Sequence, residues 1–361
     1  MDTSLAKTLL TLNNITCGYD GHQVVRNLSF SVTQGEMISL LGSSGCGKTT
    51  VLRAVAGFAP LEAGEIILGQ ECISKSGFTL PPEKRKVGMV FQDYALFPHL
   101  TVAANVAYGL HGRSKAEQNK ITKEMLQLVG LEKWSDRHPH ELSGGQQQRT
   151  ALARALAPHP ELILLDEPFS NLDADLRERL SLEVRQILES QNMTGILVTH
   201  DQHEAFAWGD KVGVLHQGAL CQWGTPYDLY HKPANRFVAG FIGQGCFLSG
   251  VYAGPDAILT SAGMLQGSQT FSGQDGDPLE VLIRPDDVIP DESSNITARI
   301  VRRAFKGAEI LYTLQLDSGC RLQSLFPSHR NHEVGETLRI RVATDHLVAF
   351  QESLPCSTSV I

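Results

Sequence analysis

The sequence predicts an α/β domain followed by a small all-β domain, and three observations carry that prediction. Strands alternate with helices over the first 242 residues, and one Gly-rich loop joins a strand directly to a helix. After residue 243 the pattern changes to short alternating strands among Gly, Pro, Ser and Asp. The first pattern is typical of a mainly parallel sheet covered by helices on both faces, and the last of a small antiparallel barrel. We therefore expect two domains, residues 1–242 and residues 243–361.

In the first domain, one segment in which apolar and polar residues alternate predicts a half-buried strand, and several short apolar runs predict buried strands. They lie at 24–32, 36–41, 87–91, 161–166, 195–199 and 211–216. Helical stretches are predicted between them, at 48–57, 114–130, 145–157 and 173–191. In the second domain, alternation predicts strands at 280–283, 296–301, 310–316 and 337–342, with no long helix.

Composition excludes several classes of protein. The chain has 361 residues and is 42% hydrophobic, enough apolar material for a large core, so wholesale disorder is ruled out. A net charge of -8 argues against a protein that coats nucleic acid. No apolar run approaches the roughly 18 residues of a membrane span. The seven cysteines are scattered along the sequence, which favours a reducing compartment. The basic run Lys84-Arg85-Lys86 matches no motif and predicts a solvated loop.

The sharpest motif is a Gly-rich loop with the pattern G-x-x-x-x-G-K-[ST], which follows a predicted strand and opens a predicted helix. The backbone amides of such a loop form a nest for phosphates, and the helix N-terminus adds positive potential. Its lysine reaches the β- and γ-phosphates, and the next hydroxyl reaches Mg²⁺. A chance Gly-rich turn is the alternative, which the strand–loop–helix context disfavours. The expected nucleotide-binding residues are Gly42, Ser43, Ser44, Gly45, Cys46, Gly47, Lys48, Thr49 and Thr50.

The second motif is a pair of adjacent carboxylates at the end of the apolar run 162–165. Asp166 is placed to hold Mg²⁺ beside the phosphates, as at the strand ends of phosphoryl-transfer enzymes. Glu167 is the candidate to orient or deprotonate the attacking water. A strand followed by a solvated acidic turn is the alternative, and a phosphate-binding loop in the same chain favours the catalytic interpretation.

The third motif is LSGGQ at 142–146, which continues as QQR and opens a predicted helix. A Ser-Gly-Gly at a helix start makes a second phosphate nest, and Ser143 equally suits the N-cap. With its place between the Gly-rich loop and the LLDE run, this segment resembles the signature of ATP-binding cassette (ABC) ATPases. The resemblance implies a P-loop ABC cassette that binds ATP and Mg²⁺. It also implies nucleotide contacts from Ser143, Gly144, Gly145 and Gln146.

Four further positions match this family. Gln92 in VFQDYALFPHLTV corresponds to its Q-loop glutamine, Asp173 in SNLD to its D-loop aspartate and His200 in ILVTH to its switch histidine. Tyr19 in CGYDG corresponds to the aromatic residue that stacks on adenine. The expected catalytic residues are Glu167, His200 and Gln92, and the expected metal ligands are Thr49, Gln92 and Asp166.

The resemblance also implies partners. In this family the signature of one subunit faces the P-loop of another, so a C₂ homodimer with two ATP sites is expected. The cycle couples to an integral membrane permease through a groove beside the Q-loop and the helical subdomain, residues 93–158 here. A periplasmic or extracellular solute-binding protein would act indirectly, and nucleic acid is not expected. The subunit would be peripheral, on the cytoplasmic face of the inner membrane.

The second domain refines the expected class of transporter. Residues 243–361 resemble the OB-like (TOBE) domain of importer ATPases of the maltose, polyamine, sulfate and ferric-iron group, with Arg284-Pro285-Asp286 at its conserved turn. Three spans, QDYALFPHLTVAANVAYGL, THDQHEAFAWGD and DLYHKPANRFVAGFIGQG, look most like the ferric-iron branch, so Fe³⁺ is the expected solute. Polyamine, thiamine, sulfate and phosphonate remain alternatives.

Rivals from other classes fit less well. Repair-type cassettes insert a long coiled coil between P-loop and signature, whereas 94 positions separate Lys48 from Leu142 here. Translation-type cassettes carry two copies per chain, and this chain has one. A regulatory cassette would have a damaged Glu167 or His200, and both are present. An exporter is less expected, since no membrane domain is fused and the β tail points to importers.

Overall fold

The computed structural model describes residues 7–19, 21–170, 172–267, 273–343 and 346–351. The chain divides into two compact units, Met1–Pro226 and Tyr227–Ile361. Helix α7 (Pro226–His231) begins at this division, and α8 (Arg236–Phe241) lies in the second unit. The predicted domain boundary between residues 242 and 243 stays a prediction.

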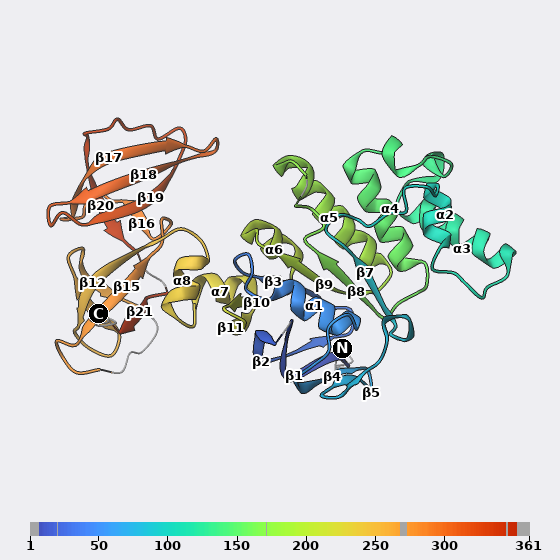
Figure 1. Ribbon diagram of the computed structural model, residues 1–361. Helices are drawn as coiled ribbons and strands as arrows, with labels where there is room; N and C mark the ends of the chain where they lie inside the picture. The colour runs from blue at the N-terminus through green and yellow to red at the C-terminus, as the bar shows by residue number, and fades with distance from the viewer. Residues whose placement is uncertain (1–6, 20, 171, 268–272, 344–345, 352–361) are drawn as a thin grey trace, which may run out of the picture. The chain divides into compact units, whose positions relative to one another are not determined.

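The centre of the first unit is a six-stranded sheet with the order β11-β10-β3-β9-β8-β7 (Figure 1). Its five strands from β10 to β7 are parallel, and β11 pairs antiparallel at one edge. Every residue of β3, β8 and β9 is buried, which explains their continuous apolar sequence. The strands are β3 (Met37–Leu41), β7 (Val87–Val90), β8 (Leu162–Asp166), β9 (Thr194–Thr199), β10 (Lys211–His216) and β11 (Ala219–Gly224).

A second, antiparallel sheet has the order β2-β1-β4-β5-β6. It contains β1 (Thr8–Tyr19), β2 (His22–Thr33), β4 (Ala63–Leu68), β5 (Glu71–Lys75) and β6 (Phe78–Thr79). The strand predicted at 24–32 is β2. The sequence pattern missed β1, because its alternation is interrupted by a register shift between Leu12 and Ile15, where Asn14 has a φ of 48°. Helix α1 (Lys48–Ala56) contacts strands of both sheets and so lies between them.

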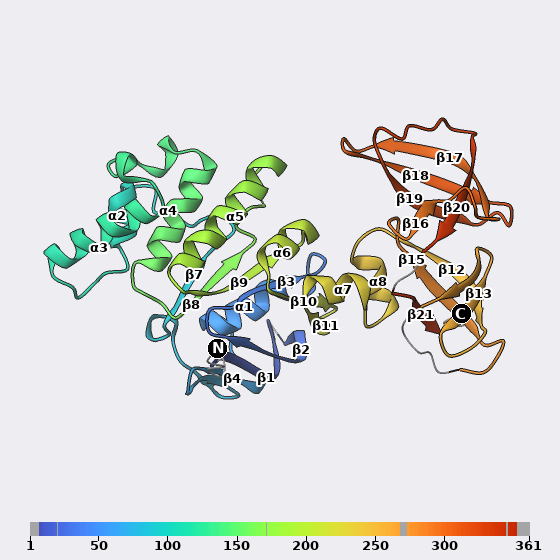
Figure 2. The ribbon, with the colours of Figure 1, turned by 180° about the vertical axis from the view of Figure 1, so that it is seen from behind.

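The sequence predicts three of the remaining helices of the first unit and misses two. Residues 93–158, the expected helical subdomain, contain α2 (Val102–Ala107), α3 (Lys115–Leu128) and α4 (Gly144–Leu156), which lie together at one end of the unit (Figures 1 and 2). Short 3₁₀ turns lie at Pro82–Lys84, Glu132–Trp134 and Pro139–Glu141. Helices α5 (Ala174–Ser190) and α6 (Gln202–Trp208) follow β8 and β9. Of these helices, α3, α4 and α5 lie where the sequence predicts them, whereas α2 and α6 were not predicted. Ser114 caps α3 in a capping box with Glu117, which fixes where that helix begins.

The expectation of a solvated loop at Lys84-Arg85-Lys86 is wrong for Arg85, whose side chain is 5% exposed. Its guanidinium donates hydrogen bonds to the carbonyls of Ala54 and Val55 at the end of α1, and also to Leu80 and Ile73. The last carbonyls of a helix have no partners within the helix, so Arg85, from a loop distant in sequence, caps the C-terminus of α1. Burial lowers its pKa to about 10.

The second unit is built from two five-stranded antiparallel sheets, ordered β14-β13-β12-β15-β21 and β16-β20-β17-β18-β19. Buried side chains from both sheets form one apolar cluster that includes Ile258, Ile300 and Leu314. No helix follows α8 in the part of the chain that the structure describes, as predicted. The strands are β12 (Cys246–Tyr252), β13 (Ala257–Thr260), β14 (Gly263–Gln266), β15 (Pro278–Ile283), β16 (Val288–Pro290), β17 (Thr297–Phe305), β18 (Glu309–Leu316), β19 (Arg321–Pro327), β20 (Thr337–Val342) and β21 (Val348–Gln351).

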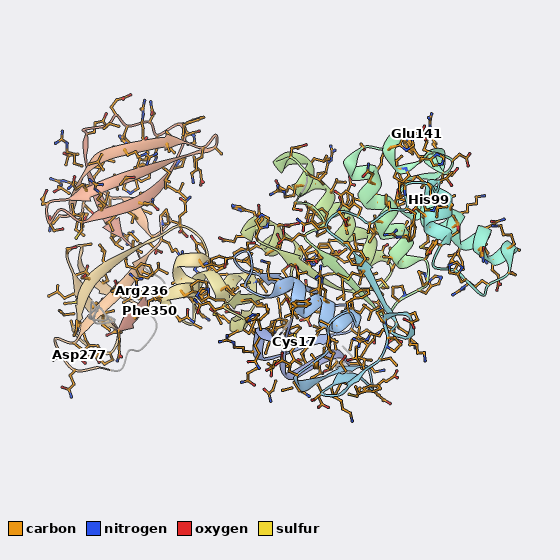
Figure 3. The ribbon with its side chains drawn as sticks, viewed as in Figure 1. Cys17, His99, Glu141, Arg236, Asp277 and Phe350 are labelled. Atoms are coloured by element: carbon orange, nitrogen blue, oxygen red, sulfur yellow. The ribbon has the colours of Figure 1, made fainter. Side chains whose placement is uncertain are left out.

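Helix α8 packs on the outer face of the first of these sheets. Arg236 of α8, labelled in Figure 3, lies 4.5 Å over the ring of Phe247 and pairs with Glu280 of β15. Below it, Ala239, Leu282 and Val348 form a small apolar cluster. The helix is therefore tied to the sheet by both polar and apolar contacts.

None of the helices in the described ranges is long and apolar enough to cross a membrane. The six cysteines within those ranges are free. Among them, burial raises the pKa of Cys17 to about 11, which makes its thiol unreactive.

Candidate functional site

The Gly-rich loop lies between β3 and α1, as the motif requires. Gly45 and Gly47 have φ values of 78° and 107°, a left-handed backbone that disfavours residues with a side chain. At Gly42 a Cβ atom would lie 2.4 Å from the carbonyl oxygen of Leu215, so the strand leaves no room for one. The loop's backbone path therefore depends on glycine at these positions.

Lys48 is buried at the start of α1, with 4% of its side chain exposed. Its Nζ donates hydrogen bonds to the carbonyls of Gly42, at 2.8 Å, and Ser43, at 3.0 Å. It also lies 4.0 Å from Oε1 of Glu167. The ammonium group is thus held against the loop, at the N-terminus of a helix, where an anion is favoured.

Two of the three predicted metal ligands are in direct contact. The hydroxyl of Thr49 donates a 2.8 Å hydrogen bond to Oδ1 of Asp166 at the end of β8. Burial raises the pKa of Asp166, and this hydrogen bond opposes the shift. The third, Gln92, donates from Nε2 to the hydroxyl of Ser170 at 3.4 Å, and Ser170 in turn donates to the Glu167 carbonyl at 2.9 Å.

These donors suit a magnesium ion. A hydroxyl, a carboxylate and an amide supply hard oxygen ligands, and Mg²⁺ in phosphoryl-transfer sites takes only one or two carboxylates beside substrate phosphates. The buried carboxylate of Asp166, whose pKa is raised by desolvation, is a group whose charged form a divalent cation would stabilise. We treat Thr49, Gln92 and Asp166 as the residues that would hold it.

Glu167 and His200 form a pair at the ends of neighbouring strands. Nδ1 of His200 lies 3.1 Å from Oε2 of Glu167. Glu167 has a φ of 45°, a left-handed conformation that costs a non-glycine residue on the order of 1–3 kcal/mol and is concentrated at functional sites. With 20% of its side chain exposed, Glu167 is not the solvated acidic turn that was the alternative interpretation.

The signature segment begins α4. Ser143 is the N-cap: its hydroxyl accepts from the amide of Gln146, and the Gln146 side chain accepts from the Ser143 amide. Gly144 and Gly145 are tightly packed, since Cβ atoms there would lie 3.1 Å from Leu172 and 3.0 Å from Leu180. The N-cap interpretation is therefore correct. Among the described residues, the side-chain hydrogen bonds of Ser143 stay within its own helix start.

The segment after Gln92 is hydrogen-bonded to α4, the helix that the signature segment begins. Tyr94 and Ala95 both have left-handed backbones, with φ values of 60° and 45°. Arg154 in α4 donates to both of their carbonyls, at 2.8 Å to Tyr94 and 2.6 Å to Ala95. Sequence reasoning missed Arg154; the signal it offered was a cation in the last turn of the signature helix.

Comparisons with known proteins identify the family. Residues 25–170 match the ABC transporter model, and residues 281–350 match the TOBE domain. A spermidine/putrescine import ATP-binding protein, PotA, of Marinobacter nauticus is 42% identical over 87% of this chain and 86% of that protein. Its counterpart in Vibrio parahaemolyticus is 39% identical, over 93% and 92%. The one in Lawsonia intracellularis is 39% identical, over 96% and 97%.

The chain belongs to the ABC transporter ATP-binding proteins. The predicted fold class, an ABC cassette followed by an all-β TOBE domain, is confirmed. ATP is the nucleotide that the cassette implies. None of these three relatives is named for iron, so the expected ferric-iron branch finds no support in them.

The other predicted residues of the cassette differ in exposure: two are buried in or beside α1, and one aromatic ring is partly exposed. Asp173 caps α5, where its Oδ1 accepts from the amide of Leu176 at 3.0 Å. Tyr19 ends β1 with 39% of its side chain exposed, which leaves its ring available for stacking. Thr50 is buried in α1. Cys46 is also buried, and burial raises the pKa of its thiol, as expected for a small packing residue.

Proposed function

We propose that this chain is the ATP-hydrolysing subunit of an importer for polyamines. The observation that carries the proposal is 39–42% identity, over 87–96% of the chain, to proteins named for spermidine/putrescine import. That similarity spans both the cassette and the TOBE domain. Polyamine import was an alternative on the sequence alone, and the relatives favour it over Fe³⁺.

The geometry supports hydrolysis of a bound nucleoside triphosphate. The amides of the loop 42–49 and the Lys48 ammonium would bind the phosphates, and the Tyr19 ring would stack on adenine. Mg²⁺ held by Thr49, Gln92 and Asp166 would neutralise charge on the phosphates. The residues of the chain would therefore act mainly by positioning and by electrostatic stabilisation.

Glu167 is the proposed general base. Its carboxylate lies at the end of β8 beside Asp166, where it would orient the attacking water and take its proton. His200 holds Oε2 of Glu167 at 3.1 Å and so fixes the direction of the carboxylate. The left-handed backbone of Glu167, a strained conformation that is concentrated at functional sites, also supports this role.

The complete site is proposed to form between two copies of the chain. Ser143, Gly144, Gly145 and Gln146 make no contact with the P-loop of their own chain among the described hydrogen bonds. In a C₂ homodimer they would reach the γ-phosphate bound by the partner, and Asp173 would lie at the same interface. ATP binding would close the dimer, and hydrolysis would open it.

A groove of about 610 Å³ beside the Q-loop supports coupling to a permease. Phe91, Phe97 and Tyr108 supply aromatic surface to it, and Arg154, which pins the Q-loop, lines it as well. A permease helix lying in this groove would act on the segment that carries Gln92. The subunit would then be peripheral, on the cytoplasmic face of the inner membrane, with a solute-binding protein on the other side.

Uptake of radiolabelled spermidine in cells that lack this gene tests the proposal. Wild type should restore uptake, and the Glu167→Gln variant should not. Uptake of Fe³⁺ is measured in the same cells. Restored Fe³⁺ uptake with unchanged spermidine uptake would overturn the polyamine assignment, and restoration by Glu167→Gln would overturn the role of Glu167.

A further inference from the structure

Glu204 of α6 is a buried carboxyl group that the proposed chemistry does not use. Its side chain is 8% exposed, and its Oε2 accepts a hydrogen bond from the hydroxyl of Thr199. Its Oε1 is buried with no hydrogen-bond partner in the described structure. A carboxyl group is costly to bury, so its position calls for a physical explanation.

The partner of Glu204 is the residue before the switch histidine. The hydroxyl of Thr199 donates to Glu204 and also accepts from the backbone amide of Asp201 at 3.0 Å. These two bonds fix the backbone on both sides of His200. Since Nδ1 of His200 lies 3.1 Å from Glu167, the position of this backbone decides where the imidazole meets the proposed base.

A second connection links the same loop to the D-loop. Arg177 of α5 pairs with Oδ2 of Asp201 at 3.2 Å and donates to the carbonyl of Leu172 at 3.1 Å, beside Asp173. Oδ1 of Asp201 caps α6 by accepting from two of its amides. Residues 199–201, called the switch loop here, are thus held to α6 by Thr199 and Asp201 and to Leu172, beside the D-loop aspartate, by Arg177.

A cavity of about 240 Å³ between α5 and α6 borders this network. Arg177, Ser181, Asp201 and Glu204 line it, and buried polar atoms of Arg177, Ser181 and Glu204 have no hydrogen-bond partner in the described structure. Glu178 and His203 line the cavity as well. Burial is the main cause that disfavours the ionised form of Glu204; the charges of Asp201 and Glu167 add to it, whereas the Thr199 hydrogen bond and Arg177 oppose it. Ser181 borders the same space without contacting the switch loop in the described hydrogen bonds, which makes it a matched control.

We propose that Glu204 is a positioning residue for ATP hydrolysis, which fixes the backbone of His200 through the hydroxyl of Thr199. The inference rests on the proposed roles of Glu167 and His200. Glu204 touches neither the P-loop nor the proposed metal ligands in the described hydrogen bonds. Its removal should therefore slow the chemical step and leave ATP binding intact.

The test is steady-state ATP hydrolysis by the full chain. Glu204→Ala should lower kcat by about 10- to 100-fold, because a small misplacement of a catalytic group has that effect, and should leave KM for ATP within about twofold. Glu204→Gln keeps an oxygen that accepts from Thr199, so it should retain most of kcat. Ser181→Ala should match wild type. Thermal unfolding of each variant separates these effects from loss of the fold.

Thr199→Val removes the same hydrogen bond from its other end and serves if Glu204→Ala does not fold; it should lower kcat in the same way. Equal kcat values for wild type and either of these variants would overturn the inference, as would equal losses in Glu204→Ala and Ser181→Ala. Glu167→Gln is assayed beside them. If it remains active, the proposed base is wrong; if it alone is inactive, only the role of Glu204 fails.

Discussion

The two units of the chain differ in how they use buried polar groups. Of the sixteen buried polar or charged residues in the described ranges, only Arg284 and Ser324 lie in the second unit. The cassette buries Lys48, Asp166 and Glu204 close to its nucleotide loop and switch loop. Burying such groups costs free energy unless they are paired, so an apolar unit is the cheaper construction. The comparison shows that the first unit places buried polar groups around the proposed nucleotide site, whereas the interior of the second unit is almost entirely apolar.

The same substitution made in both units gives the largest expected contrast. Glu167→Gln keeps the shape of the side chain and removes the base, so ATP turnover should fall by about 10²- to 10⁴-fold while ATP still binds. Glu280→Gln removes one charge from a partly exposed, bidentate ion pair with Arg236 and should change stability by about 1 kcal/mol, with turnover unchanged. Comparable turnover in the two variants would remove the basis of the contrast.

A core substitution in the second unit should lower stability and leave nucleotide binding unchanged. Ile300 is fully buried in its apolar cluster, so Ile300→Ala should destabilise that unit by about 2–5 kcal/mol. Nucleotide affinity, measured by titration, should stay at the wild-type value, because the apolar cluster around Ile300 is built from residues of the second unit. Val334→Ala, at a site 55% exposed, is the control and should lie within about 0.5 kcal/mol of wild type. A loss of nucleotide affinity in Ile300→Ala would mean that the units do not act separately.

The last expected effect is a change of stability with pH. Burial raises the pKa of Glu204 from 4.5 to about 7 in the folded chain. Between about pH 4.5 and 7 this carboxyl is ionised in the unfolded chain but still protonated in the folded one, so wild type loses stability as the pH rises through this window. Glu204→Gln does not ionise. Its stability relative to wild type should therefore increase over this window, by up to about 3 kcal/mol. Thermal midpoints at pH 5 and pH 8 measure it, and a difference that does not change with pH would contradict the prediction.

The local sequence was enough to predict those features that depend on residues adjacent in the chain. The loop 42–49 needs glycine for its own backbone, and the apolar strand ending in Asp166 needs burial on both faces, so both were predictable. Ser143 was identified as an N-cap from its position alone and is one. The solute was less predictable, because the three spans that suggested the ferric-iron branch did not separate it from the polyamine importers to which the chain is similar.

Tertiary structure alone decided which distant side chains meet. Arg85 looks like part of a solvated charged run, yet it caps α1 from 30 residues away in sequence. Nothing around Arg154 shows that it holds Tyr94 and Ala95, and nothing around Glu204 shows that it is buried against Thr199. The sequence determined the cassette, its phosphate loop and the identity of its carboxylates, because these depend on short-range pattern. The burial, pKa and partners of those groups were decided only by packing, because desolvation and hydrogen bonding depend on segments that are remote in the chain.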